Sequence, residues 1–185
     1  MDNGASSYRR FLSGDDSGIA EIVREYKDGL IIYINGYVNN YFIAEELAED
    51  TFFRIITKKP RYSGKSTFKT WLYAIGRNIA VDHIRRDSKL SSTDLSELEN
   101  QLSDWQSLEQ SYIKEDRKRV VHKSLSKLPT DYKIVLWLIY FEDFSNAEAA
   151  VIMKKSDRQI KNLLYRAKRS LKTILEKEGF IYEEL

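Results

Sequence analysis

Residues 145–175 read SNAEAAVIMKKSDRQIKNLLYRAKRSLKTIL, and this stretch contains two consecutive helix starts. Ser145 stands three positions before Glu148, and Ser156 stands three positions before Gln159. Each pair can form a capping box, in which the hydroxyl accepts from one unpaired backbone amide and the acidic or amide side chain accepts from another. The stretch therefore predicts two successive helices separated by a tight turn.

The second of these helices combines one apolar stripe with a basic face. Apolar residues recur at steps of three and four, which is the spacing of a single helix face. The stripe consists of Ile160, Leu163, Leu164, Ala167, Leu171 and Ile174. The basic face consists of Arg158, Lys161, Arg166, Lys168, Arg169 and Lys172. Asp157 is the only acid before Glu176, and Asn162 and Tyr165 add groups able to contact a base or a phosphate.

This stretch has the layout of a helix-turn-helix, with a short helix over 145–153, a turn at 153–156 and then a longer helix. The alternative is an ordinary helical hairpin whose basic face is merely solvated. The turn carries no glycine, so Lys154 or Lys155 must adopt the unusual backbone conformation that such a turn requires.

The composition favours a helical protein without a catalytic centre. The 185 residues include only 8 glycines and 2 prolines, with 31% charged residues. The absence of cysteine excludes disulfides, zinc fingers and thiol nucleophiles. His83 and His122 have no second histidine or cysteine at ligand spacing, and the carboxylates cluster as solvated faces rather than as a buried pair, so we expect no metal, no cofactor and no enzymatic activity. No apolar run has membrane-spanning length and no signal peptide is present, which predicts a soluble cytoplasmic protein without membrane insertion.

The first part of the chain predicts a bundle of four helices. Residues 1–14 are polar and are expected to form a loose arm. Apolar spacing then predicts helices over 17–26 with Ser17 as cap, 28–40, 43–58 and 67–87, so that one domain spans 15–88. The third of these helices carries an acidic face made of Glu45, Glu46, Glu49 and Asp50.

Before the fourth helix, Pro60 interrupts the pattern and residues 59–67, KPRYSGKST, predict a basic loop. Gly64, Lys65 and Ser66 resemble the end of a phosphate-binding loop. That motif needs another glycine where Lys59 stands, and also a preceding strand. We therefore reject a nucleotide-binding loop.

The second part of the chain predicts a separate helical domain over 105–178. Residues 89–104 are rich in serine and acid and predict a flexible linker. A helix is expected over 105–127, and the next helix, with Pro129 in its first turn, is apolar nearly all round. It should be central, with the helix-turn-helix packed upon it and residues 179–185 as a tail. The expected fold is all-α, with two small helical domains.

Two stretches together resemble the bacterial RNA polymerase sigma factors, specifically the extracytoplasmic-function (ECF) group of the sigma-70 family. The first is AEELAEDTF at 44–52 with FKTWLYAIGRNIAVDHIRR at 68–86. The second runs from LP at 128–129 through YFEDFS at 140–145 to KNLLYRAK at 161–168. The chain departs from the family pattern at Ile43, Gly76, Lys154 and Leu163.

The resemblance implies a region 2 domain, a region 4 domain, and a protein that binds core RNA polymerase, directs it to promoters and helps to open the duplex. It implies that the acidic helix meets the clamp helices of the polymerase and that region 4 meets its flap. The candidate polymerase-binding residues are Glu45, Glu46, Leu47, Glu49, Asp50 and Phe52. A charged face serving solubility remains the alternative for this helix.

For region 2, the resemblance implies contact with the opened strand at the minus-ten element, where unpaired bases need a pocket and a stacking surface. The candidates are Arg61, Tyr62, Ser63, Gly64, Lys65, Lys69, Trp71, Arg77, Asn78, Asp82, Arg85 and Arg86. Trp71 fits core packing as well as a wedge against a base pair. Asp82 fits an intrahelical pair with Arg85 or Arg86 as well as a DNA contact.

For region 4, the resemblance implies a recognition helix in the major groove of the minus-thirty-five element. The candidates are Ser156, Arg158, Gln159, Lys161, Asn162, Tyr165, Arg166 and Arg169. An anti-sigma factor is a further possible partner. Two other functions fit the helix-turn-helix: a transcriptional regulator acting without the polymerase core, and a helical protein-interaction module.

Overall fold

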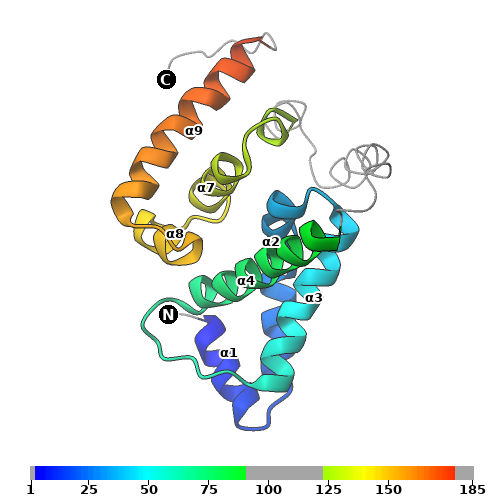
Figure 1. The fold of residues 1–185 in the computed structure, drawn as a ribbon. Coiled ribbons are helices and arrows are strands. Elements are labelled where there is room, and N and C mark those ends of the chain that lie inside the picture. Colours follow the sequence, from blue (N-terminus) through cyan, green and yellow to red (C-terminus); the bar gives the residue numbers. More distant parts are fainter. Residues whose placement is uncertain (1–2, 91–122, 178–185) are drawn as a thin grey trace.

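The computed structural model describes residues 3–90 and 123–177, and all regular elements within these ranges are helices (Figure 1). They are α1 (Asn3–Leu12), α2 (Ser17–Val38), α3 (Tyr41–Lys58), α4 (Phe68–Leu90), α7 (Thr130–Tyr140), α8 (Asn146–Met153) and α9 (Asp157–Lys177), together with a helical turn at 123–126. The predicted all-α fold is confirmed. Three predicted parts lie wholly or partly outside the described residues: positions 91–104 of the expected linker, positions 105–122 of the helix expected over 105–127, and the tail at 179–185.

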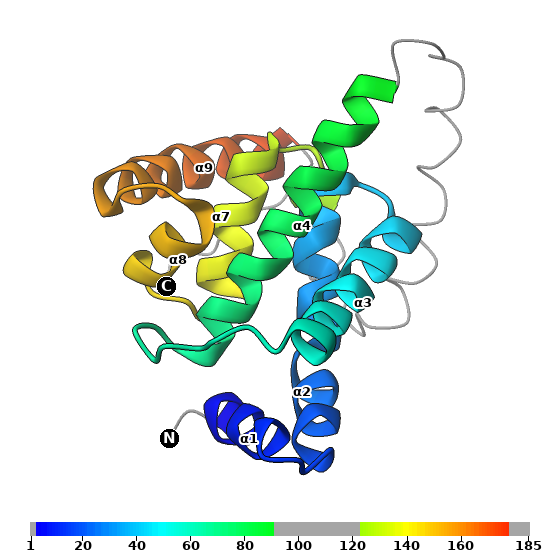
Figure 2. The same cartoon turned by 60° about the horizontal axis from the view of Figure 1, so that its bottom comes forward.

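Helices α2, α3 and α4 pack around one core, and α1 lies across the N-terminal end of α2 (Figure 2). Ile22, Leu30 and Ile34 of α2 are completely buried. They share one core cluster with Ile55 of α3 and Leu72 of α4, which are also completely buried. The bundle thus has four helices, although not the four that the apolar spacing predicts.

The expectation of a loose arm over residues 1–14 is wrong for residues 3–12, which form α1. Tyr8 and Phe11 are 1% and 5% exposed. The Tyr8 ring lies 5.5 Å from that of Phe68, and its hydroxyl donates to the Pro60 carbonyl at 2.8 Å. A Cβ at Gly18 would stand 2.2 Å from the Ser7 carbonyl oxygen, so α1 and α2 touch at backbone distance. Two buried aromatic rings thus fix a segment whose polar composition predicts a loose arm.

Two further expectations in this region are corrected. Residues 17–26 and 28–40 do not form two helices, because α2 runs from Ser17 to Val38 without a break at Asp28 or Gly29. Ser17 is also not the cap but the first helical residue. The N-cap residue is Asp16, which makes no side-chain cap hydrogen bond, and the Ser17 backbone amide donates to the Asp15 carboxylate at 3.0 Å.

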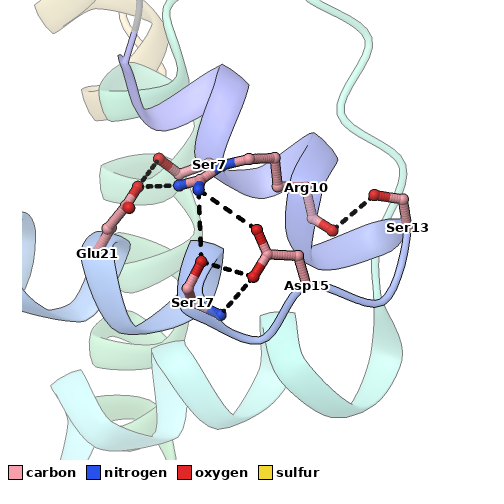
Figure 3. Close-up of polar contacts among 6 residues, drawn as sticks. All are labelled: Ser7, Arg10, Ser13, Asp15, Ser17 and Glu21. Atoms are coloured by element: carbon pink, nitrogen blue, oxygen red, sulfur yellow. Dashed lines mark hydrogen bonds and ion pairs between the residues drawn. The ribbon is translucent and has the colours of Figure 1, made fainter.

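Arg10 fixes α1 to α2 through a surface network drawn in Figure 3: its guanidinium pairs with Glu21 and Asp15, and Ser7 donates to Glu21 at 2.8 Å. The hydrogen bond from Arg10 lowers the pKa of Glu21, and hydrogen bonds from Ser17 lower the pKa of Asp15.

Because these pKa values are depressed in the folded state, the carboxylates contribute stability above their ordinary pKa values of 4.5 and 3.8 and lose it as pH falls. Urea unfolding from neutral pH to about pH 3 should show this loss, and Arg10→Ala should reduce its slope. Arg9→Ala is the matched control, because the Arg9 guanidinium donates to the Ala5 backbone carbonyl at 3.3 Å rather than to a carboxylate. Equal pH profiles for the two variants would contradict the assignment.

In the second half, α7 is the central helix, as predicted. Ile134, Val135, Leu136 and Leu138 are buried, and α8 and α9 pack against α7. Pro129 is the residue immediately before α7, where its missing amide costs no helical hydrogen bond.

The two helical halves expected from the sequence contact each other in this structure. Helix α4 contacts α8, and α2 contacts α7 (Figures 1 and 2). Helix α4 extends to Leu90, two residues beyond the predicted end of the first domain at residue 88.

Candidate nucleic-acid interface

The helix-turn-helix has the predicted local structure. The Ser145 hydroxyl accepts from the Glu148 amide while the Glu148 carboxylate accepts from the Ser145 amide. The Gln159 side chain accepts from the Ser156 amide at 2.7 Å, and the Ser156 hydroxyl accepts from the Gln159 amide at 3.2 Å. Both capping boxes are therefore present, and the second fixes the start of α9.

The turn between α8 and α9 obtains its conformation from Lys154, whose φ of 54° is in the left-handed region. Its backbone amide donates to the carbonyls of Ala150 and Val151, which closes the end of α8. The next residue, Lys155, forms an ion pair of 3.0 Å with Asp131 of α7. The recognition helix is thus held at a defined angle without a turn glycine.

All eight candidate residues for the minus-thirty-five element have exposed side chains: Ser156, Arg158, Gln159, Lys161, Asn162, Tyr165, Arg166 and Arg169. Tyr165 is 69% exposed. Ser156 and Gln159 use part of their hydrogen-bonding capacity in the capping box. Lys161 pairs with Asp157 at 2.8 Å, so it must leave this exposed partner to reach a base. The buried side of α9 contains Ile160, Ala167 and Leu175.

A second surface is built where the loop before α4 passes α1 (Figure 2). The loop and α1 line a groove with a volume of about 640 Å³. Its lining residues are Ala5, Tyr8, Arg9 and Leu12 of α1 and Tyr62, Ser63, Gly64, Lys65, Ser66 and Thr67 of the loop. Sequence reasoning missed the α1 contribution, because the apolar spacing of Tyr8, Phe11 and Leu12 covers too few residues to predict a helix.

The groove residues Tyr8 and Tyr62 belong to an aromatic cluster that also contains Phe68 and Trp71. The Trp71 ring lies 5.3 Å from Tyr8, 5.4 Å from Tyr62 and 5.3 Å from Phe68. The Tyr62 hydroxyl donates to the Ser66 carbonyl, which closes the loop upon itself. Trp71 is half-buried within this cluster, so the geometry favours the packing role over a free wedge.

The remaining minus-ten candidates differ in their exposure to solvent and in their ion pairs. Arg61, Ser63, Gly64, Lys65, Arg85 and Arg86 are exposed, whereas Arg77 and Asn78 are half-buried. Asp82 lies 3.8 Å from Arg85, which is the intrahelical pair considered above. Lys69 is not free, because its ammonium pairs with Glu142 at 2.8 Å.

Burial raises the pKa of Tyr37, and the adjacent Tyr33 and Arg77 partly offset this increase in the pKa.

The acidic face of α3 is present, but two candidates for polymerase contact are buried. Leu47 and Phe52 are 3% and 5% exposed, so they pack in the core of the free protein. Glu46, Glu49 and Asp50 are exposed, and Glu45 is half-buried.

The same helix exposes apolar side chains that sequence reasoning missed. Phe42 is 63% exposed, Phe53 is 64% exposed and Ile56 is 36% exposed. Together with Glu46 and Glu49 they follow steps of four, three, four and three, which is one helix face. The sequence contained a signal for this face, because Phe53 does not follow the helical spacing of the buried residues. Exposed aromatic residues beside acids are typical of a protein interface.

No cluster of three or more metal-ligating side chains occurs in residues 3–90 and 123–177. Across the same part of the chain, no helix is both long enough and apolar enough to cross a bilayer.

Comparison with known proteins agrees with this architecture. The family model for Sigma-70 region 2 matches residues 22–90, and that for Sigma-70 region 4 matches residues 118–171. The probable RNA polymerase sigma-C factor of Mycobacterium bovis is 30% identical over 135 residues, covering 73% of this chain and 71% of that protein. The RNA polymerase sigma-H factor of Pseudomonas aeruginosa is 26% identical over 175 residues, covering 90% and 91%.

Among solved structures, the sigma factor RpoE of Bartonella quintana, in complex with the anti-sigma factor NepR, superposes with a TM-score of 0.64. The match has 20% sequence identity and covers 85% of this chain and 96% of that one. The family models for region 2 and region 4 match the chain in that order. These matches agree with the all-α fold, the helix-turn-helix and the second basic surface. The chain belongs to the sigma-70 family of RNA polymerase sigma factors, in its ECF group.

Proposed function

We propose that this sigma factor binds core RNA polymerase mainly through α3, reads the minus-thirty-five element with α9, and holds the opened minus-ten strand between α1 and the loop before α4. The observation that carries the proposal is the distribution of charge over three exposed surfaces. Two of them are basic and the third is acidic. Basic surfaces attract the phosphate backbone, whereas an acidic surface repels it.

For α9, the exposed side chains near the N-terminus of the helix face the base edges when the helix enters a major groove. Arg158, Lys161 and Asn162 are exposed on the first two turns and are the proposed base contacts. Tyr165, Arg166 and Arg169 lie further along and would set the phosphate register.

Lys161→Ala is expected to weaken binding to a matched minus-thirty-five element by about 1 to 3 kcal/mol, and mismatched elements by less. The physical reason is that a base contact contributes only where its partner base is present. Lys172→Ala is the matched control, because it removes the same charge from an exposed pair further along α9. Competition binding of the reconstituted holoenzyme to a set of promoter fragments measures the affinity of both variants. Equal losses at all sequences would make Lys161 a phosphate contact.

For region 2, the groove of about 640 Å³ has a scale suited to an unstacked base. Lys65 and Arg9 are exposed at this groove and would neutralise the strand backbone, and the rings of Tyr8 and Tyr62 line its wall. Gly64, at a φ of 72°, places the loop backbone close to the groove without a side chain.

For the polymerase, the exposed Phe53 and the carboxylates of Glu46 and Glu49 form a surface that combines an apolar anchor with charge. Lys27 of α2 pairs with Glu45 at 3.3 Å and with Glu49 at 3.8 Å. These pairs partly neutralise the face in the free protein. A basic partner surface, such as clamp helices, would compete for the same carboxylates.

The proposed activity is binding and positioning rather than catalysis, in the bacterial cytoplasm. An anti-sigma factor is a proposed partner as well, because the Bartonella sigma factor of similar fold is bound to one. A helix-turn-helix regulator acting alone would have no use for the acidic and apolar face of α3. The test is pull-down of core polymerase by the full chain, followed by run-off transcription from a promoter library. Capture of core with selective initiation supports the proposal, and failure of either step refutes it.

A further inference from the structure

The start of α4 is in direct contact with the connection between α7 and α8. The Lys69 ammonium lies 2.8 Å from the Glu142 carboxylate and donates to the Glu142 backbone carbonyl at 2.8 Å. The Glu142 side chain is only 10% exposed, and that of Lys69 is 31% exposed. An ion pair with so little solvent access is screened less than a surface pair.

A second carboxylate from the same segment contacts the same turn of α4. The hydroxyls of Thr67 and Thr70 each lie 3.1 Å from the Glu148 carboxylate. Partial burial raises the pKa of Glu148, but hydrogen bonds from Ser145, Thr70 and Thr67 outweigh it and leave the pKa below its usual value. Glu148 therefore has two functions, because it also closes the capping box of α8.

Aromatic packing surrounds these polar contacts. The Phe144 ring stands 5.1 Å from the Tyr73 ring of α4, and the Lys69 ammonium lies over Phe144 at 4.9 Å. Phe144 is 4% exposed. Between Glu142 and Phe144, Asp143 has a φ of 57°, a left-handed conformation that is uncommon for a non-glycine residue. The connection is bent so that both neighbours contact region 2.

Helix α2 also packs closely against α7 and against the connection between α7 and α8. A Cβ at Gly29 would stand 2.6 Å from a Glu142 carboxylate oxygen, and one at Gly36 would stand 2.6 Å from the Ile134 side chain. These two glycines are seven positions apart on one helix face. The Lys133 ammonium also donates to the Asn39 side chain at 2.6 Å. The contact thus extends along α2 and α4.

We propose that this interface is an autoinhibitory contact, in which region 4 covers Lys69 and the start of α4 until promoter DNA and polymerase displace it. The inference rests on the proposed function, because Lys69 belongs to the minus-ten surface. One ammonium cannot neutralise both a low-exposure carboxylate and a DNA phosphate. Binding of the strand therefore requires the Glu142 contact to open, and the closed fraction reduces apparent affinity for DNA.

Glu142→Gln tests the polar part of the contact, since it removes the charge and keeps the shape. The isolated full-length variant should bind a single-stranded minus-ten oligonucleotide about tenfold more tightly than the wild type, the size expected for one charged hydrogen bond. Glu176→Gln is the matched control, because it makes the same charge change at an exposed pair on α9. Equal affinities of the two variants would overturn the proposal.

A cross-link tests the closed state independently. The chain contains no cysteine, so Asn39→Cys with Lys133→Cys provides two unique thiols across the interface for a reducible bismaleimide. Neither residue belongs to the proposed DNA or polymerase surfaces. The cross-linked protein should lose at least about tenfold in run-off transcription, and reduction should restore it. Full activity of the cross-linked protein would overturn the autoinhibitory contact, whereas an inactive wild type would refute the proposed function itself.

Discussion

Phe53→Asp is expected to abolish stable association with core RNA polymerase. Phe53 is 64% exposed near the centre of the acidic and apolar face of α3, between Glu46, Glu49 and Ile56. A central aromatic anchor in an interface typically contributes about 2 kcal/mol or more, so affinity should fall at least roughly thirtyfold. An added carboxylate would also be left desolvated against the partner.

The stability of the free protein should be almost unchanged by this substitution, within about 0.5 kcal/mol, because the side chain is solvated before binding. Fluorescence anisotropy of labelled protein titrated with core polymerase measures the affinity. Phe53→Leu is the matched control, since it keeps an apolar side chain and should retain most binding. Wild-type affinity for Phe53→Asp would remove α3 as the principal polymerase surface.

Tyr8→Ala is expected to cost about 3 to 5 kcal/mol of unfolding free energy, the range for removing a buried aromatic side chain. Tyr8 is 1% exposed, and its ring contacts Phe11, Phe68 and Trp71. The loss is large because these rings join α1 to α4 and would be left around a cavity. Urea denaturation monitored by tryptophan fluorescence and circular dichroism gives the value.

Tyr8→Phe separates packing from hydrogen bonding. It keeps the ring and removes only the bond to the Pro60 carbonyl, so about 1 kcal/mol should be lost. A Tyr8→Ala protein as stable as wild type would mean that α1 is not part of the folded domain. The same result would remove the α1 side of the groove at the loop.

Local chemistry made much of this fold predictable. The capping boxes at Ser145 and Ser156 depend on residues three positions apart, so short-range spacing was sufficient to predict them. The left-handed residue in the turn was narrowed to Lys154 or Lys155, and Lys154 adopts it. The eight exposed residues of α9 followed from the same argument, because one apolar stripe determines which side of a helix remains outside.

What spacing did not predict depends on contacts between distant segments. Polar composition favoured a loose arm before residue 15, whereas burial of Tyr8 against Phe68 orders it. Leu47 and Phe52 lie in the motif that resembles the family, yet only the packed structure shows that they face the core and Phe53 does not. Likewise, nothing in the sequence near Lys69 indicates a partner for its charge, but Glu142, 73 positions later, neutralises it.

The contact between the two halves also bears on how the chain would bind a promoter. Two DNA readers on one chain increase each other's local concentration once one of them is bound. The contacts of Lys69, Thr70 and Lys133 show that the same two halves can instead bind each other. DNA and the intramolecular partner would then compete for one surface. The free protein is therefore expected to bind DNA weakly.

Run-off transcription by core polymerase with the purified chain tests the central claim most directly, on templates in which the minus-ten element, the minus-thirty-five element or both are altered. The account predicts specific transcripts from the intact promoter, none without this chain, and a loss when either element is changed. Transcription that ignores both elements, or no initiation with active core and folded protein, would contradict it.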